Sequence, residues 1–563
     1  MSKILRVFLF FLAVPSFAAT HAEHTDALIS AYNKLRQFNG SALVAEKGSV
    51  ILSKGYGLAN MEWQIPNTPD TKFRVGSITK QFTSMVIMQL VGEGKIKLDE
   101  KITNYLPDYR KDTGDRVTVR HLLTHTSGIP SYTSLPGFIQ NQARDPYSVA
   151  DFVKKYTSGD LEFEPGSKFS YDNSGYFLLG AIIEHVTGKP YEQVLKERIF
   201  DPLGMHDSGY DRSATVIARR ASGYVMTPGG FENAPYLDMS IPYAAGSLYS
   251  TVEDLYKWDR ALYTDKLLVP ELKKTTFTAN LNEYAFGWAV HKIKLDDKSE
   301  VNVISHDGGI NGFNTTIVRF PETQDLIVLL DNTSRGDRID ELARGIADIL
   351  HGVEPPQPRA SLVDELMKTL ATADGKQAVA RYRELKAKAA DQYDFRENEL
   401  NRLGYTLLQG GRVVDAIDIF QLNVEAYPQS FNVYDSLGEA YAAHGDRDLA
   451  IKNYRKSLEL NPKNTNAADA IKRLEQPASK VDAATLDKYA GTYALGPGFN
   501  LTITHEGATL FAQATGQPKV EMAADSATEF HILAVKASIT FAPDGSALTL
   551  HQGGRDLPAP RIK

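Results

Sequence analysis

The spacing of hydrophobic and polar positions changes several times along the chain, and these changes divide it into segments. Near the N-terminus, residues 41–46 and 49–56 are strand-like and flank Lys47-Gly48, which predicts a β-hairpin. Strand-like runs return at 302–305, 313–320 and 326–330, and a helical pattern follows at 339–350. Strands at both ends with helices between them predict an α+β domain with an antiparallel sheet over residues 23–352.

The middle of the chain is helical and repeats itself. Leu403-Gly404 and Leu437-Gly438 are separated by 34 residues, and the same offset relates Gly411 to Gly445, Ala416 to Ala450, Phe420 to Tyr454 and Pro428 to Pro462. A 34-residue period with small residues where helices cross resembles tetratricopeptide (TPR) repeats. We therefore expect a helical TPR region over residues 362–476, with Phe420 and Tyr454 in its core. Residues 363–388 are a candidate for a degenerate third unit, because such stacks need neighbours to bury both faces.

Two breaks bound this region. Three prolines within residues 355–358 cannot continue a helix, so residues 353–361 are expected to form a stiff linker. A shorter break lies at Gln476-Pro477-Ala478-Ser479. Beyond it, residues 480–563 contain short alternating strands and turns such as Pro543-Asp544-Gly545, which predict a small antiparallel β-barrel.

The first residues have the three-part pattern of a secretory signal peptide over residues 1–22. Lys3 and Arg6 precede an apolar run at 7–14, and small residues then lead to possible cleavage after Ala18 or Ala22. The apolar run is too short to cross a bilayer, which takes about 20 residues. No later stretch is long and apolar enough to do so, so we expect an exported protein, periplasmic or secreted, with no membrane span once the signal is removed.

Composition narrows the chemistry. The 563 residues include no cysteine, which excludes disulfides, thiol nucleophiles and cysteine-ligated metals. The net charge of −7 and the absence of a Lys/Arg-rich run give no sign of nucleic-acid binding. His121 and His125 are four residues apart and could share a helix face as metal ligands, but no third ligand is evident, so structural roles are preferred. We expect no metal and no cofactor.

The first chemical motif is Ser77-Ile78-Thr79-Lys80. Apolar positions at helical spacing follow it, so Ser77 is expected at the start of a helix, where free N–H groups favour developing negative charge. The spacing of three residues places Lys80 on the same face as Ser77. A serine hydroxyl is a poor nucleophile at neutral pH and needs a base beside it, a role that a lysine can take when it is neutral. Alone, this short pattern is a weak signal, equally explained by a serine helix cap followed by a solvated lysine.

Two more motifs follow in order. Tyr171 and Asn173 lie in a polar loop before an apolar helical stretch, where Tyr171 could accept the serine proton and Asn173 could hold Lys80 and a substrate amide. His306-Asp307-Gly308-Gly309 ends a predicted strand. Its glycines allow a ligand to approach the backbone closely, and His306 could bind a substrate carboxylate or relay a proton.

Together these residues resemble the three-motif signature of the serine β-lactamase and penicillin-binding-protein superfamily, in the branch with class C β-lactamases, D-aminopeptidases and esterases. The resemblance extends over residues 27–350 and includes the flanking runs His121–Ile129, Tyr284-x-x-Gly287-Trp288 and Ala245-Gly246-Ser247. It implies that Ser77 is acylated and that Lys80 and Tyr171 share acid and base duty. It also implies that Asn173 positions them and that the N–H groups of Ser77 and Gly309 form the oxyanion hole. The tail, with Tyr489-Ala490-Gly491, looks like the lipocalin-like domain often appended to such hydrolases.

One departure bears on the substrate. True β-lactamases usually have Lys-Thr-Gly as the third motif, whereas this chain has His-Asp-Gly, and a histidine would hold a β-lactam carboxylate less firmly. We therefore expect an exported serine hydrolase acting on a small amide or ester, such as a D-amino-acid peptide or carboxyl ester. The alternatives are a class C-like β-lactamase and an inactive scaffold whose TPR repeats bind a protein partner.

Overall fold

The computed structural model describes residues 20–135, 138, 142–227, 230–295, 300–475, 481–496, 498–517, 519–533, 535, 537–552 and 555–563. The chain divides into two compact units. The first holds the residues up to Ile96, Thr187–Gly223 and Ala244–Pro358, and the second holds Lys97–Val186, Tyr224–Tyr243 and Arg359–Lys563. Most of the predicted signal peptide (residues 1–19) and the predicted break at 476–479 lie outside the described residues.

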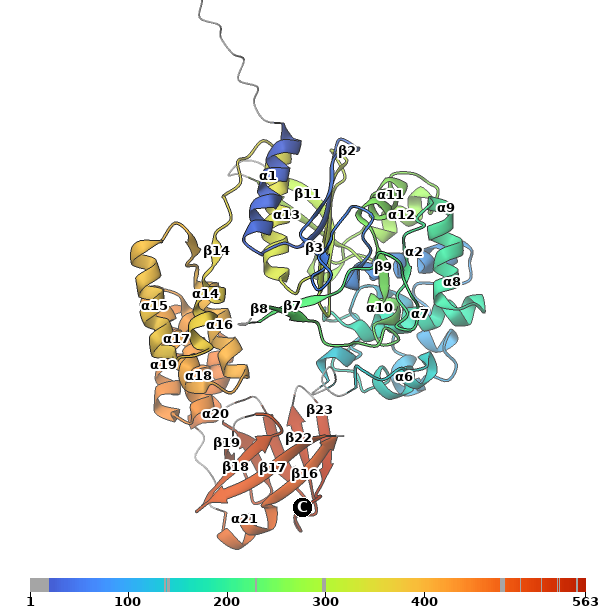
Figure 1. Cartoon of the computed structure of the whole chain (residues 1–563). Helices are drawn as coiled ribbons and strands as arrows, with labels where there is room; N and C mark the ends of the chain where they lie inside the picture. Colours follow the sequence, from blue (N-terminus) through green and yellow to red (C-terminus); the bar gives the residue numbers. More distant parts are fainter. Residues whose placement is uncertain are drawn as a thin grey trace, which may run out of the picture. The chain divides into compact units, whose positions relative to one another are not determined.

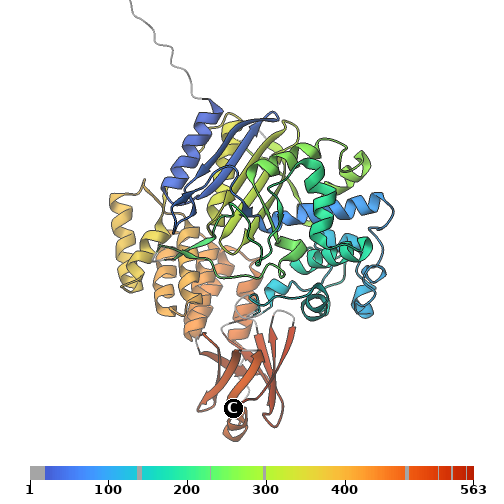
Figure 2. The same ribbon diagram turned by 45° about the vertical axis from the view of Figure 1, so that its right-hand side comes forward.

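A six-stranded antiparallel sheet forms the centre of the first unit, in the order β10-β11-β12-β13-β1-β2. Its strands are β1 (Gly40–Glu46), β2 (Ser49–Tyr56), β10 (Ala289–Lys294), β11 (Glu300–Ile310), β12 (Phe313–Phe320) and β13 (Asp325–Asp331). The predicted hairpin and the antiparallel sheet are confirmed. Figure 2 shows the N-terminal hairpin in blue beside the yellow-green strands, and Gly40 of β1 lies opposite Asp331 of β13. Strands from near the two ends of the predicted domain are therefore neighbours within one sheet.

Two helices far apart in sequence, α1 (His21–Lys34) and α13 (Gly336–Leu350), lie side by side against the sheet (Figure 1). Their apolar faces and the inward side chains of the sheet form one buried cluster, which includes Leu28, Ile29, Leu342 and Ile346. Helix α1 begins with a capping box, in which the Thr20 hydroxyl accepts from the N–H of Glu23 and the Glu23 carboxylate accepts from the N–H of Thr20.

The remaining elements of the first unit are short apart from α2 and α11. They are β3 (Leu58–Asn60), β4 (Ile65–Pro66), β5 (Phe73–Arg74), the 3-10 turn η1 (Gly76–Ile78), α2 (Thr79–Gly92), α8 (Tyr191–Leu195), η4 (Lys196–Phe200), α9 (Asp201–Leu203), β6 (Gly209–Tyr210), α10 (Tyr243–Gly246, which begins in the second unit), β9 (Leu248–Ser250), α11 (Val252–Leu262), α12 (Pro270–Thr276) and η5 (Leu281–Glu283). Strands β5, β9 and β6 form a small sheet of their own.

The second unit begins with a mainly helical segment. Its elements are η2 (Ile102–Asn104), α3 (Lys111–Gly114), α4 (Val119–Leu123), η3 (Tyr132–Ser134), α6 (Val149–Tyr156) and α7 (Asn173–Thr187, whose last residue falls in the first unit), with a hairpin of β7 (Tyr224–Thr227) and β8 (Gly230–Asn233). Aromatic rings fill its interior: Phe152 stacks on Phe177 at 4.4 Å between centroids and meets Tyr132 edge-on at 5.0 Å.

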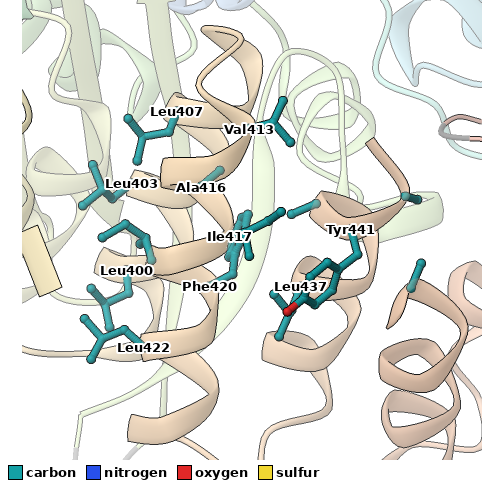
Figure 3. Close-up of a cluster of buried hydrophobic side chains, with 14 of the residues drawn as sticks. Leu400, Leu403, Leu407, Val413, Ala416, Ile417, Phe420, Leu422, Leu437 and Tyr441 are labelled. Atoms are coloured by element: carbon teal, nitrogen blue, oxygen red, sulfur yellow. The ribbon is translucent and has the colours of Figure 1, made fainter. Parts of the chain in front are cut away.

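The TPR region consists of stacked antiparallel helices. They are α14 (Leu362–Leu370), α15 (Gly375–Lys388), α16 (Glu397–Gln409), α17 (Val413–Ala426), α18 (Phe431–His444), α19 (Arg447–Leu460) and α20 (Thr465–Glu475). A short parallel pair joins β14 (Ala360–Ser361), directly before α14, to β15 (Tyr393–Asp394), shortly before α16. Figure 3 shows Leu400, Leu403 and Phe420 among the buried side chains that join these helices. Helices α14 and α15 contribute to the same cluster, so residues 363–388 extend the stack as expected.

The last segment is a nearly closed eight-stranded barrel preceded by α21 (Ala483–Tyr489). Its strands are β16 (Gly491–Gly496), β17 (Phe499–Glu506), β18 (Thr509–Ala514), β19 (Val520–Ala524), β20 (Glu529–Ile532), β21 (Ala537–Phe541), β22 (Ala547–Gln552) and β23 (Arg555–Pro560). Next to the end of β23, the N–H of Ile562 donates to the carbonyl of Thr492 in β16, which brings the first and last strands together. Side chains such as Tyr493 and Phe541 fill the interior. Within the described ranges, no helix has the length and apolar character needed to cross a bilayer.

Candidate active site

The nucleophile motif lies where the chain passes from β5 into α2. The pattern predicted a helix starting at Ser77, and the structure places Ser77, half-buried, in the 3-10 turn η1, directly before α2. The turn is anchored by Val75, whose N–H donates to the carbonyl of Leu248 at 2.9 Å and whose carbonyl accepts from Ile78 at 3.2 Å. The turn therefore holds Ser77 at the N-terminal end of a buried helix.

Lys80 lies beside this serine. Its Nζ donates to Ser77 Oγ at 3.0 Å and to the carbonyl oxygen of Ala245 at 2.9 Å. The side chain is fully buried, with 0% of its surface exposed. One turn further along α2, the Thr83 hydroxyl donates to the carbonyl of Ala244 at 2.7 Å, so α2 holds α10 at two successive residues. The amine thus has a fixed direction toward the serine oxygen.

The glycines of the third motif lie against the nucleophile turn. A Cβ atom on Gly308 would be 2.0 Å from the carbonyl oxygen of Val75, so only glycine fits there. Gly76 has φ +51°, in the left-handed region that favours glycine, and a Cβ on it would lie 3.0 Å from the N–H nitrogen of Gly309. The sequence predicted this motif at the end of a strand, and it lies in the last part of β11, which continues to Ile310.

His306 is held on both sides of its ring. Its Nδ1 lies 2.7 Å from the carbonyl oxygen of Asp307, and its Nε2 lies 2.9 Å from the hydroxyl of Tyr284. Because a carbonyl only accepts, Nδ1 carries a proton and donates it. His306 is buried, with 7% of its surface exposed, so binding a substrate carboxylate would require it to exchange one of these bonds.

The second motif belongs to the second unit. Tyr171 is 39% exposed and its ring lies 4.2 Å from that of His125, while His125 is fully buried. The backbone N–H of Asn173 donates to Ser131 Oγ at 3.1 Å, and its side-chain amide donates to Thr133 Oγ1 at 3.2 Å. Asn173 is also the first residue of α7, so its orientation is tied to a buried helix.

Asp172, between the two motif residues, holds this loop. It is buried, its carboxylate accepts from the N–H of Gly175 and from Ser127 Oγ, and its own N–H donates to Nδ1 of His125 at 3.1 Å. A carboxylate that accepts the free N–H groups of a first turn is a typical helix cap. The run His121–Ile129 therefore supports the loop that carries Tyr171.

The first unit thus brings together Ser77 and Lys80 by a direct hydrogen bond, and places Gly308 and Gly309 against the same turn. Tyr171 and Asn173 lie in the second unit. Their approach to Lys80, and the catalytic and binding roles of all these residues, stay predictions.

The two histidines weighed as metal ligands have structural surroundings. Helix α4 ends at Leu123 and His125 has φ +55°, so the two residues do not share one helix. The Nδ1 of His121 accepts from the N–H of Thr118 at 3.3 Å, and burial lowers the pKa of His121. Over the ranges that the structure describes, no group of three His, Asp or Glu side chains has the arrangement of a metal site.

Sequence patterns missed two contacts of this site. Ala245 belongs to the flanking run Ala245-Gly246-Ser247, but it contacts Lys80 through its carbonyl oxygen alone, and the residue type gives no sign of that contact. Thr315, on the strand next to the third motif, donates from its hydroxyl to the carbonyl of Val75 at 3.0 Å. A threonine in a strand is ordinary, so nothing in its neighbourhood could have indicated that contact.

Family models match three parts of the chain: "Beta-lactamase" at residues 25–351, "Tetratricopeptide repeat" at 431–464 and "Domain of unknown function (DUF3471)" at 475–556. PbpX of Bacillus subtilis, which is named after the penicillin-binding proteins, is 31% identical over 325 residues, covering 57% of this chain and 78% of PbpX. The TPR match confirms the repeats predicted from the 34-residue period.

Solved structures agree on the fold. D-amino acid amidase from Ochrobactrum anthropi, solved with D-phenylalanine, is 27% identical with a TM-score of 0.51, covering 59% of this chain and 99% of the amidase. An octameric penicillin-binding protein homologue from Pyrococcus abyssi has 20% identity and a TM-score of 0.51 over 96% of both chains, which shows the fold alone. Because the first family model spans more than half of its residues, this chain belongs to the beta-lactamase family and is a serine hydrolase of that class.

Proposed function

We propose that this chain hydrolyses small amides or esters, above all amides of D-amino acids, through an acyl-enzyme on Ser77. The observation that carries the proposal is the 3.0 Å contact between Ser77 Oγ and the Nζ of Lys80, which is completely buried. A base within hydrogen-bond reach of a hydroxyl at a helix start is the arrangement that an activated serine requires.

In this mechanism Lys80, in its neutral form, takes the proton of Ser77 as the oxygen attacks the substrate carbonyl. The negative charge that develops on the carbonyl oxygen is received by the N–H groups of Ser77 and Gly309. Removing one such donor typically costs about 10²–10³ in rate. Tyr171, as the partner acid, gives a proton to the leaving amine or alcohol, and water then releases the acyl group by the reverse sequence.

The substrate class rests on two supports. The solved amidase with a similar fold is named as an amidase of D-amino acids. The third motif has His306 where β-lactamases usually carry a lysine, and both of its ring nitrogens already have partners at 2.7 and 2.9 Å. A site without a fixed cation at this position suits amides and esters that bear no free carboxylate.

The direct test compares D-phenylalanine amide with L-phenylalanine amide as substrates of the purified protein. We expect faster release of ammonia from the D-enantiomer and an acyl adduct on Ser77 in the intact mass. Both signals should vanish in Ser77→Ala. Turnover that survives this substitution, or a clear preference for the L-enantiomer, would overturn the proposal.

A second candidate activity is hydrolysis of β-lactams, favoured by the 31% identity to PbpX. Nitrocefin tests it. We expect acylation of Ser77 by a fluorescent penicillin but slow overall turnover, because both ring nitrogens of His306 already have hydrogen-bond partners and would bind a substrate carboxylate only weakly. Rapid nitrocefin turnover would instead make this activity the principal one.

Export through the N-terminal signal is also proposed. Of the two expected cleavage points, the one after Ala18 leaves Thr20 and the capping box of α1 intact, whereas cleavage after Ala22 removes that cap. N-terminal sequencing of protein recovered outside the cytoplasm should read Ala19 first. Retention of Met1 in all recovered protein would refute export by this signal.

The TPR region is proposed to bind a protein or peptide partner, because stacked repeats provide an extended surface for such contacts. The test is a pull-down with the Ser77→Ala protein, compared with the same protein carrying substitutions in α16 and α18. The scaffold alternative, in which the hydrolase is inactive, predicts partner binding without any labelling of Ser77 by a fluorophosphonate.

A further inference from the structure

Thr315 connects the strand that carries the third motif to the turn that carries the nucleophile. It lies on β12 directly opposite Gly308 of β11 and is 1% exposed. Its hydroxyl donates to the carbonyl of Val75 at 3.0 Å and lies 3.3 Å from the carbonyl of Gly308. One buried hydroxyl therefore lies between the two backbone segments that precede the expected oxyanion-hole donors.

The Val75 carbonyl accepts two hydrogen bonds that hold the turn. It accepts from the N–H of Ile78 at 3.2 Å, which closes η1 around Ser77, and it accepts from Thr315 at 3.0 Å. On the other side of the peptide chain, the N–H of Val75 donates to Leu248. Removing the Thr315 hydroxyl would leave the turn closed but loosen its attachment to the sheet.

The same hydroxyl explains the glycine at position 308. A Cβ there would lie 2.0 Å from the Val75 carbonyl oxygen and 2.3 Å from Thr315 Oγ1. The backbone of β11 thus lies too close to the turn to leave room for a side chain at position 308. Gly309 follows in the strand, and its nitrogen is 3.0 Å from the Cβ position of Gly76.

We propose that Thr315 is a positioning residue for the oxyanion hole: its hydroxyl sets the separation between the N–H groups of Ser77 and Gly309. It touches no substrate and no reacting atom. The proposal rests on the proposed acyl-enzyme at Ser77. An oxyanion hole works because its donors are already placed where charge develops, and a misplacement of about 1 Å can cost roughly 100-fold in rate.

Thr315→Val keeps the shape of the side chain and removes only the hydroxyl, while Thr315→Ser keeps the hydroxyl. Thr316→Val is the matched control, because Thr316 is equally buried on the same strand and faces the opposite side of the sheet, opposite Asp307. The probes are p-nitrophenyl acetate and the corresponding thionoester. The larger sulfur is a poor acceptor for a hole shaped around oxygen, so the ratio of the two rates reports the geometry of the hole.

We expect Thr315→Val to lower kcat for the oxygen ester roughly 10- to 100-fold with little change in KM, and to reduce the preference for the oxygen ester over the thionoester. Thr315→Ser should restore most of the rate, and Thr316→Val should leave the ester preference unchanged. Fluorophosphonate titration of active sites corrects each rate for any misfolded fraction.

An unchanged kcat and ester preference in Thr315→Val, in a protein that is labelled at Ser77, would overturn the role of Thr315 alone. Equal loss in Thr315→Val and Thr316→Val would reduce Thr315 to a structural residue. Absence of labelling at Ser77 in the wild type would instead refute the proposed function.

Discussion

The hydroxyl of Tyr284 and the Nε2 of His306 lie 2.9 Å apart, and both side chains are buried. Because Nδ1 donates to the carbonyl of Asp307, the Nε2 of the neutral ring is an acceptor, and the hydroxyl of Tyr284 donates to it. The histidine of the third motif is therefore part of the protein interior as much as of the substrate site.

Tyr284→Phe should weaken the fold and alter substrate choice. Loss of the phenol leaves a buried ring nitrogen without this bond, which costs about 1–3 kcal/mol of unfolding free energy. Without that bond, His306 can turn toward a substrate carboxylate, so activity on dipeptides should rise relative to activity on the matching amides. Kinetics on a D-alanyl-D-alanine peptide and its amide, with urea unfolding, measure both effects.

Tyr256→Phe is the control for this change. Tyr256 also makes a hydroxyl hydrogen bond in the same unit, but it donates to the backbone carbonyl of Gly48 at 2.8 Å and belongs to none of the three motifs. It should cost stability without shifting the ratio of peptide to amide activity. A similar shift in both variants would contradict the assigned role of Tyr284.

Lys80→Ala and Tyr171→Phe should each reduce turnover by several orders of magnitude. General acid–base catalysis contributes about 10²–10⁴, and Lys80 also aligns Ser77 Oγ through the 3.0 Å contact. Lys72→Ala is the control, since Lys72 forms a 3.0 Å ion pair with Asp207 in the same unit. Single-turnover rates on a chromogenic ester measure the effect, and wild-type-like rates in either variant would refute its role.

Gly308→Ala should disrupt the site through sterics alone. Its Cβ would lie 2.0 Å from the Val75 oxygen, whereas a Cβ on Gly309 meets only Asn314 Oδ1, at an ordinary 3.8 Å. Overpacking of this kind costs roughly 1–3 kcal/mol. We expect a lower Tm for Gly308→Ala and a Tm near that of the wild type for Gly309→Ala. Equal Tm values would show that β11 can withdraw from the turn.

The sequence allowed a good part of this arrangement to be predicted. The hairpin at 40–56 follows from local alternation and from Lys47-Gly48, which both have positive φ, as a type I′ hairpin turn requires. The stack of helices follows from a period of 34 residues, which places equivalent side chains in equivalent contacts. Both signals are local or repeated, so one sequence suffices to show them.

Other features depend on contacts between distant residues. The alternation of β11 fades at Gly308-Gly309, because glycines have no side chains to alternate, so the strand looked shorter than it is. Thr315 meets Val75 across 240 residues of sequence. The grouping of residues 97–186 with 359–563 in one compact unit has no signature in composition or spacing.

The stability of the protein should depend on the ionisation of Asp331. Burial raises the pKa of this carboxyl from 3.8 to about 7, against the opposing hydrogen bonds from Thr333 and Asn39. Between these values the folded state keeps a proton that the unfolded state has released. The contribution of Asp331 to the unfolding free energy therefore falls by roughly 4 kcal/mol as pH rises from about 4 to about 7. Above about pH 7 this contribution no longer changes with pH.

Asp331→Asn removes this titration, so the unfolding free energy of the wild type minus that of the variant should fall steadily, by roughly 4 kcal/mol, from pH 4 to pH 7. Only the slope is diagnostic, because the amide also replaces one acceptor oxygen of the network. Urea unfolding at several pH values measures it. A difference that is constant with pH would show that the carboxyl ionises freely in the folded protein.

The crossing of helices within each repeat depends on two glycines at equivalent positions. A Cβ on Gly404 would lie 2.5 Å from the ring of Phe420, and one on Gly438 would lie 3.0 Å from the ring of Tyr454.

Gly404→Ala should therefore cost about 1–3 kcal/mol locally and Gly438→Ala less. Gly496→Ala, with nothing within 4 Å of its Cβ, is the control. Because the expected effect is local to these helices, amide hydrogen exchange in α16–α19 is the suitable measurement. Faster exchange in Gly438→Ala than in Gly404→Ala would contradict this order and show that the Phe420 ring has room to move aside.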